Sequence, residues 1–150
     1  MKTELLTVAP PCLSAPPRER MMSLFLQTAS AIERRLDAVL EAVELSGPKY
    51  GALTKLAEAG EPLALSELAA RLTCVRSNIT QLVDRLEADG LVRRVEDPKD
   101  RRSVRAALTP LGEERQAAGA VRVKELRRTV AEALVGIEEE ALERALLALR

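Results

Sequence analysis

Ser66–Leu108 reads SELAARLTCVRSNITQLVDRLEADGLVRRVEDPKDRRSVRAAL and contains two short helical patterns followed by two strand patterns. We expect the first helix at Ser66–Leu72 and the second at Arg76–Ala88. The second helix has apolar residues at i, i+3, i+4 and i+7, which predict a buried stripe of Ile79, Leu82, Val83 and Leu86. Two short helices joined by a tight connection are typical of a helix-turn-helix.

A β-hairpin is expected directly after the second helix, which Asp89-Gly90 ends. Strand patterns at Leu91–Val95 and Ser103–Leu108 flank a charged, turn-forming segment, Glu96–Arg102. The second strand alternates two sets of residues, Val104, Ala106 and Leu108 against Arg105 and Ala107. A helix-turn-helix followed by a hairpin is a winged helix, which we place in residues 46–109.

Two helices and an arm are expected before this core. Residues 1–17 hold four of the eight prolines and should form an extended or disordered arm. Amphipathic periodicity predicts a first helix over Arg18–Leu45. A second helix is expected over Pro48–Ala59, with Ser46 as its cap candidate and Gly60 at its end.

Two further helices are expected after the hairpin. Thr109-Pro110 supplies a cap and a first-turn proline for a long helix that runs to Gly136. The last helix opens with three acids, which favour a helix N-terminus, and carries an apolar stripe of Leu142, Leu146 and Leu149. The apolar faces of residues 18–45 and 110–150 exceed what a small core covers. We therefore expect dimerisation helices that pack on a second copy of the chain.

The expected fold is one compact domain, mainly α with a small β-hairpin wing. Its charge is unevenly distributed, although 23 basic residues balance 23 acidic ones overall. Residues 71–105 hold 9 basic and 6 acidic side chains, whereas residues 1–70 hold 7 and 9 and residues 106–150 hold 7 and 8. The helix-turn-helix and wing therefore form the net positive part of the chain, as a nucleic-acid-binding region would.

Composition excludes several kinds of site. The chain of 150 residues has no His and two Cys, so a His base is excluded, and so is a closed zinc site of Cys and His ligands. We find no phosphate loop, nucleophile elbow or metal cluster, and we expect no enzyme activity and no cofactor. Two distant cysteines and short apolar runs indicate a reduced, cytoplasmic protein without a membrane span.

The exposed face of the helix at Arg76–Ala88 carries groups that suit base recognition. Asn and Gln pair with adenine, Arg pairs with guanine, and Ser bonds to either in the major groove. The candidate DNA-binding residues of this helix are Arg76, Ser77, Asn78, Thr80, Gln81 and Arg85. The acids Asp84 and Glu87 should lie away from the groove. In the wing, Lys99, Arg101 and Arg102 are DNA-binding candidates, and we interpret Asp100 as a wing-structuring residue that pairs with an Arg.

These residues resemble the MarR family of bacterial winged helix-turn-helix transcription regulators over about residues 45–112. The likeness lies in LAARL at 68–72, NITQLVDRLEADGLVRR at 78–94, DPKDRRS at 97–103 and LTPLG at 108–112. The resemblance implies a homodimer that binds double-stranded DNA at a pseudo-palindromic operator as a ligand-responsive repressor. It implies that Ser77, Asn78 and Gln81 read bases and that Arg101 or Arg102 enters the minor groove. A small apolar or anionic effector, or thiol oxidation, would release DNA.

The chain departs from the family pattern at two cap positions and leaves two alternatives open. Val75 and Ala64 stand where the family often has Ser or Thr, so Thr73 or Ser66 would have to substitute. One alternative is redox sensing through Cys12, although Cys12 lacks the tyrosines that surround the family's sensor thiol; Cys74 is expected to be a buried structural thiol. The other is a winged helix that binds protein instead of DNA. An effector crevice would be lined by Leu, Val and Ala with Tyr50 or Phe25.

Overall fold

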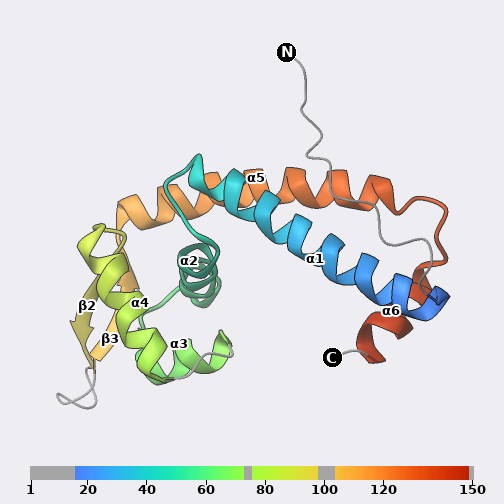
Figure 1. The fold of residues 1–150 in the computed structure, drawn as a ribbon. Coiled ribbons are helices and arrows are strands. Elements are labelled where there is room, and N and C mark those ends of the chain that lie inside the picture. The colour runs from blue at the N-terminus through green and yellow to red at the C-terminus, as the bar shows by residue number, and fades with distance from the viewer. Residues whose placement is uncertain (1–15, 73–75, 98–103, 149–150) are drawn as a thin grey trace. The chain divides into compact units, whose positions relative to one another are not determined.

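The computed structural model describes residues 16–72, 76–97 and 104–148. The chain divides into two compact units, Met1–Arg35 and Leu36–Arg150, and helix α1 (Pro17–Glu41) runs through the boundary between them (Figure 1). The predicted arm at residues 1–17 lies outside the described residues up to Ala15. In the first unit, α1 exposes a run of large apolar side chains: Met21, Met22, Leu24, Phe25 and Leu26.

Helix α1 ends at Glu41, four residues before the predicted end at Leu45. Glu44 adopts a left-handed conformation with φ of 57°. The Leu45 amide donates to the Leu40 carbonyl at 3.0 Å, and the Glu44 amide donates to the Glu41 carbonyl at 2.9 Å. This pair of bonds is a Schellman turn, which closes a helix. The predicted end at Leu45 was wrong. Val43 and Leu45 lie in the turn after the helix and are buried, so the apolar pattern continues beyond the last helical residue.

The next three helices follow the predicted positions. They are α2 (Gly47–Ala59), α3 (Leu65–Arg71) and α4 (Arg76–Ala88). Gly60 ends α2 with φ of 67°, and Gly90 follows α4 with φ of 71°, which are left-handed conformations that glycine adopts without steric cost. The predicted glycine stops are therefore confirmed. Ala64 is the N-cap of α3, and among the described residues its side chain makes no capping hydrogen bond, which agrees with the expected loss of a Thr cap.

The wing belongs to a three-stranded antiparallel sheet within the described residues. Its strands are β1 (Leu63–Ala64), β2 (Val92–Glu96) and β3 (Val104–Leu108), in the order β1-β3-β2. The predicted hairpin of β2 and β3 is confirmed, and its register pairs Arg94 with Ala106. Strand β1 was not predicted, because a strand of two residues is too short to show an alternating pattern. Its Leu63 pairs with Ala106 of β3.

The alternation predicted for β3 is wrong at one end of the strand. Val104 is 41% exposed, whereas the successive residues Ala106 and Ala107 are both buried. Helices α2 and α3 contact β3 in addition to its two neighbouring strands, whereas Val104 is the first residue of the strand. The buried face expected from Val104 to Leu108 therefore reduces to Ala106 at its centre, with Leu108 half-buried.

The core lies among α2, α3, α4 and the sheet. Its largest fully buried side chains come from every one of these elements and from the end of α1: Leu40, Leu53, Leu63, Leu68, Ile79, Leu86, Val83 and Val92. Three of the four residues of the predicted α4 stripe are among them, and Leu82 packs against the cluster from a half-buried position. Burial of each such side chain contributes about 1.5–3 kcal/mol, so the stripe fixes how α4 is rotated.

Two more helices complete the second unit: α5 (Pro110–Ala133) and α6 (Glu139–Ala148). The predicted Thr109-Pro110 start is confirmed, whereas α5 ends at Ala133 before Gly136. Gly112 lets α5 approach the core closely, because a Cβ there would lie 2.0 Å from the Leu91 carbonyl oxygen. Gly119 faces the ring of Tyr50 in the same way, with a Cβ position 2.9 Å from the ring. Tyr50 is thus a packing residue between α2 and α5.

Apolar side chains remain exposed where α5 and α6 meet. Leu134, Val135, Ile137, Leu146 and Leu147 are all exposed, and α6 has no buried residue within its described length. Leu149 of the predicted α6 stripe lies outside the described residues. Among the described residues, no helix is both long enough and apolar enough to cross a membrane.

Candidate nucleic-acid interface

Helix α4 has one buried apolar face and one exposed polar face. Ile79, Val83 and Leu86 are at most 1% exposed. The candidate residues Asn78, Thr80, Gln81 and Arg85 are all exposed on the same helix. A buried stripe at i, i+4 and i+7 turns Asn78, Gln81 and Arg85 to the opposite side of the helix, where they share one accessible surface. Thr80 is exposed at the flank of that surface.

The side chains of the remaining candidate site residues lie outside the described part of the chain. The backbone of Arg76 and Ser77 belongs to the first turn of α4, but their side chains are outside the described set. Lys99, Asp100, Arg101 and Arg102 of the wing also lie outside the described residues. The same holds for Cys12, for Cys74 and for the alternative cap residue Thr73 with Val75.

The acids of α4 are paired with an arginine from the wing. Arg94 of β2 donates from Nη1 to Glu87 Oε2 at 2.6 Å and from Nη2 to Asp84 Oδ1, and its backbone amide donates to Glu87 Oε1 at 3.2 Å. The hydrogen bond that Arg94 donates to Asp84 raises the pKa of Arg94, and the charges of both acids add to this effect. Asp84 and Glu87 are therefore held toward β2, on the side of α4 away from Asn78 and Arg85.

The base of the wing is fixed by an ion pair between a buried aspartate and a half-buried arginine, which the sequence pattern did not predict. Asp97 is 7% exposed, and its Oδ2 accepts from Arg105 Nε at 2.7 Å. Arg105 Nη1 also donates to the Pro62 carbonyl at 3.0 Å, which ties the hairpin to the chain before β1. The residue expected to structure the wing, Asp100, lies outside the described residues. The hairpin register could have predicted this ion pair. Val95 pairs with Arg105, and Asp97 lies two residues after Val95 on the same face, next to Arg105.

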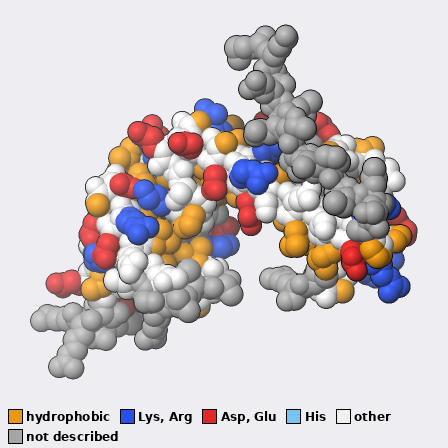
Figure 2. Space-filling view, in the orientation of Figure 1, with side chains coloured by type: hydrophobic (Ala, Val, Ile, Leu, Met, Phe, Trp, Pro, Cys, Tyr) orange, Lys and Arg blue, Asp and Glu red, His pale blue; other side chains and the backbone are white. Residues whose placement is uncertain are grey.

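The surface around α4 carries both signs of charge. In Figure 2, basic and acidic side chains are interspersed on the part of the molecule that holds α2, α4 and β2. Lys49 and Asp89 form one such pair at 2.5 Å, and Arg71 and Glu67 form another at 2.8 Å. These acids are paired with basic side chains. The net charge of the candidate interface therefore depends on the other charged side chains of α4 and the wing. Among the described residues, no group of three or more Cys, Asp and Glu could hold a metal ion.

Residues 45–104 match the model of the MarR family. The chain belongs to the MarR family. It is 35% identical over 85 residues to the uncharacterized HTH-type transcriptional regulator YsmB of Bacillus subtilis (strain 168), covering 57% of this chain and 58% of YsmB. The chain thus spans less than two thirds of that relative.

Solved structures of other MarR proteins share the fold. A MarR family protein from Bacillus stearothermophilus is 28% identical with a TM-score of 0.63, over 91% of this chain and 96% of that one. A mutant MarR from E. coli complexed with operator DNA has a TM-score of 0.74 at 22% identity, over 86% of this chain and 92% of that one. The second likeness concerns the fold alone.

Proposed function

We propose that this MarR family member is a sequence-specific DNA-binding transcriptional regulator that acts as a homodimer. The observation that carries this proposal is the exposed polar face of α4, because its rotation is fixed by the buried stripe on the other side. A helix presented in this way fits the major groove of B-DNA, which is wide enough to admit an α-helix. The family match and the regulator names of relatives support the same function.

Each candidate residue has a proposed role. Asn78 and Gln81 pair with adenine edges, Arg85 binds guanine or phosphate, and Thr80 contacts the backbone beside them. Arg76 and Ser77 act at the start of the helix, where recognition helices approach bases. In the wing, Lys99, Arg101 and Arg102 bind phosphates and the minor groove, and Asp100 shapes the turn.

We further propose a ligand-responsive repressor. A groove of about 640 Å³ runs between the end of α1 and α5, lined by Val39, Val43, Ala118, Val121, Arg122, Glu125, Leu126 and Thr129. Its apolar walls suit a small apolar effector, and an anionic one would bind through Arg122, since the other charged residue of the lining, Glu125, is an acid. Tyr50, which the sequence suggested for such a crevice, faces Gly119 and is not among the residues that line this groove.

Base readout is tested by selecting bound duplexes from a random pool and repeating the selection with Gln81→Ala. We expect the wild-type protein to select two half-sites about 10 bp apart or a multiple of that spacing. Gln81→Ala should relax one position of each half-site, at a cost of about 1–3 kcal/mol for the preferred base. Gln27→Ala in α1 is the matched control and should keep the wild-type preference. A wild-type protein that binds no duplex would leave the protein-interaction alternative in its place.

Wing contact is tested by measuring DNA affinity against salt concentration for Arg102→Ala. Loss of one phosphate contact should weaken binding and reduce the slope of log affinity against log salt by about one unit. Lys124→Ala on α5 removes the same charge elsewhere and should leave the slope unchanged. Unchanged affinity and slope for Arg102→Ala would show that this side chain does not touch DNA.

Redox sensing through Cys12 is separated from ligand response by peroxide treatment in thiol-free buffer. If the protein responds to a ligand and not to oxidation, we expect it to bind DNA after peroxide treatment as it did before. Release by peroxide that Cys12→Ser abolishes would replace the effector with thiol oxidation as the signal.

A further inference from the structure

Two acids stand on the helix that we propose reads DNA. Asp84 and Glu87 are three residues apart on α4, and both are exposed. Asp84 is also three residues after Gln81, so the two side chains are neighbours on the helix surface. A carboxylate one turn from a base-reading amide lies close to where DNA phosphates would pass. Duplex DNA carries about one negative charge per 1.7 Å, so an unpaired acid at this position opposes binding.

Arg94 contacts both acids at once. Its guanidinium donates to Glu87 at 2.6 Å and to Asp84, so a single side chain bridges two carboxylates on successive turns of α4. The Arg94 amide also donates to Glu87 at 3.2 Å, so this carboxylate accepts from both the main chain and the side chain of one residue. The acids are therefore turned toward β2, away from the side of α4 that carries Asn78 and Arg85.

The neighbouring arginine on the same strand does not share this geometry. Arg93 lines a groove of about 400 Å³ with residues of α2, the chain before β1, β3 and α5, including Glu61 and Glu113. Successive strand residues point to opposite faces, which accounts for the difference between Arg93 and Arg94. Arg93 therefore offers a control with the same charge, on the same strand, at an adjacent position.

We propose that Arg94 is a positioning residue of the DNA interface: it neutralises Asp84 and Glu87 and holds them against β2, so that the polar face of α4 can approach phosphates. This inference rests on the proposed DNA-binding function. Counted as formal charges, the three side chains carry a net charge of about −1 with Arg94 present and −2 without it. The wing strand thus contributes to DNA binding from a residue that need not touch DNA.

The test is a set of variants in the full-length chain, titrated against the duplex that the wild type selects. Arg94→Met keeps the length of the side chain and removes its charge. We expect the affinity to fall about tenfold at low salt and less than about threefold at high salt, because exposed charges are screened. Arg93→Met should stay within about threefold of the wild type at both salt concentrations.

Removing the two acids together with Arg94 shows whether Arg94 acts by neutralising their charge or by linking α4 to β2. The triple variant Arg94→Met, Asp84→Asn, Glu87→Gln lacks the bridge but also lacks both acids, so it should recover an affinity within about threefold of the wild type. The double variant Asp84→Asn, Glu87→Gln should bind at least as tightly as the wild type. A triple variant as weak as Arg94→Met would overturn the proposal, as would equal losses for Arg93→Met and Arg94→Met.

Folding and DNA binding are checked independently. Far-UV circular dichroism and the unfolding temperature report whether each variant is folded, and the double variant tests the acids without removing Arg94. If Arg94→Met does not fold, a double variant that binds more weakly than the wild type overturns the proposal by itself. A wild-type chain that binds no duplex would contradict the proposed function, which differs from a wild type that binds and an Arg94→Met variant that is unaffected.

Discussion

At the scale of single residues, two hydroxyl side chains at helix N-caps differ in the hydrogen bonds that they make. Thr109 is the N-cap of α5: its Oγ1 accepts from the Gly112 amide at 3.0 Å and donates to the Gly90 carbonyl at 2.7 Å. Ser46 holds the N-cap position of α2, and among the described residues its side chain makes no capping hydrogen bond. Both positions look alike in sequence, since each precedes a proline-containing first turn.

Thr109→Ala should therefore destabilise the protein by about 1–2 kcal/mol, because it removes a cap and the link to the end of α4. Ser46→Ala is the matched control and should cost no more than about 0.5 kcal/mol. Urea unfolding followed by circular dichroism measures both values. Equal losses for the two variants would mean that the Thr109 hydrogen bonds contribute nothing beyond those of an ordinary helix start.

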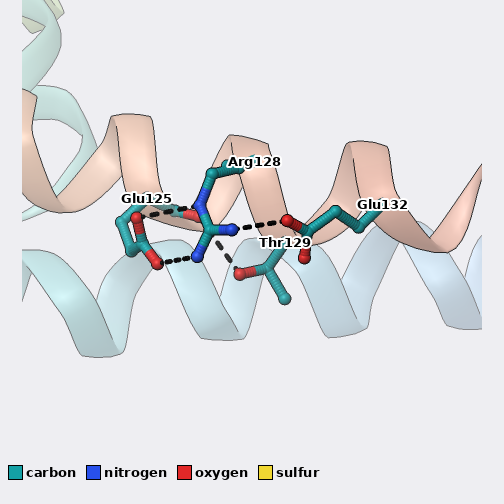
Figure 3. Close-up of polar contacts among 4 residues, drawn as sticks. All are labelled: Glu125, Arg128, Thr129 and Glu132. Carbon is teal, nitrogen blue, oxygen red and sulfur yellow. Dashed lines mark hydrogen bonds and ion pairs between the residues drawn. The ribbon is translucent and has the colours of Figure 1, made fainter.

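At the scale of elements, exposed ion pairs line the surface of α5. Arg128 lies between Glu125 and Glu132, one turn away in each direction (Figure 3). Its Nη2 is 2.5 Å from Glu125 Oε1, and its Nη1 is 2.5 Å from Glu132 Oε1. The hydrogen bonds and charge of Arg128 lower the pKa of Glu125. Pairs at i+3 and i+4 of this kind support a helix modestly, and more so at low salt.

The pH dependence of this pair has a definite sign. A carboxylate whose pKa is lowered on folding stabilises the folded state above its unfolded pKa, near about 4.3, and this contribution is lost as the pH falls through the lowered folded value. Glu125→Gln should therefore be less stable than the wild type at pH 7, and the difference should shrink below about pH 4. Thermal unfolding at several pH values tests this, with Glu114→Gln on the same helix as control. A difference that persists unchanged at acid pH would exclude the ion pair as its cause.

At the scale of the whole molecule, α6 and the end of α5 carry an exposed apolar surface. A groove of about 610 Å³ between the end of α5 and α6 is lined mainly by apolar residues that include Leu134, Val135, Ile137, Leu146 and Leu147. A helix such as α6 without a buried face gains stability mostly through packing. The proposed homodimer accounts for this surface, since a second copy carries the same surface.

Leu147→Glu should weaken that dimer. Burial of a leucine contributes about 1.5–3 kcal/mol, and a symmetric interface contains the substitution twice, so we expect the dimer dissociation constant to rise by at least about 100-fold. Sedimentation equilibrium measures this constant. Val104→Glu, which places the same charge on an exposed apolar residue of β3, should leave it within about threefold. A dimer unaffected by Leu147→Glu would place the interface elsewhere.

The sequence by itself determined the order of the helices, the proline-containing starts of α2 and α5, the glycine stops after α2 and α4, the hairpin and the buried stripe of α4. These features depend on residues a few positions apart, so periodicity and cap chemistry reveal them. For the same reason, it predicted that Asn78, Thr80, Gln81 and Arg85 are exposed. The wing residues from Pro98 to Ser103 stay predictions.

Only the tertiary structure decided the features that join distant parts of the chain. Arg105 bonds Asp97 and Pro62, which are 8 and 43 residues away, and Arg94 reaches Asp84, which is 10 residues away. Strand β1 exists because β3 offers it an edge, and α1 stops where Leu40 and Leu45 are both buried. The physical reason is that such contacts form only after the core has set the spacing of the elements, and no local pattern carries that spacing.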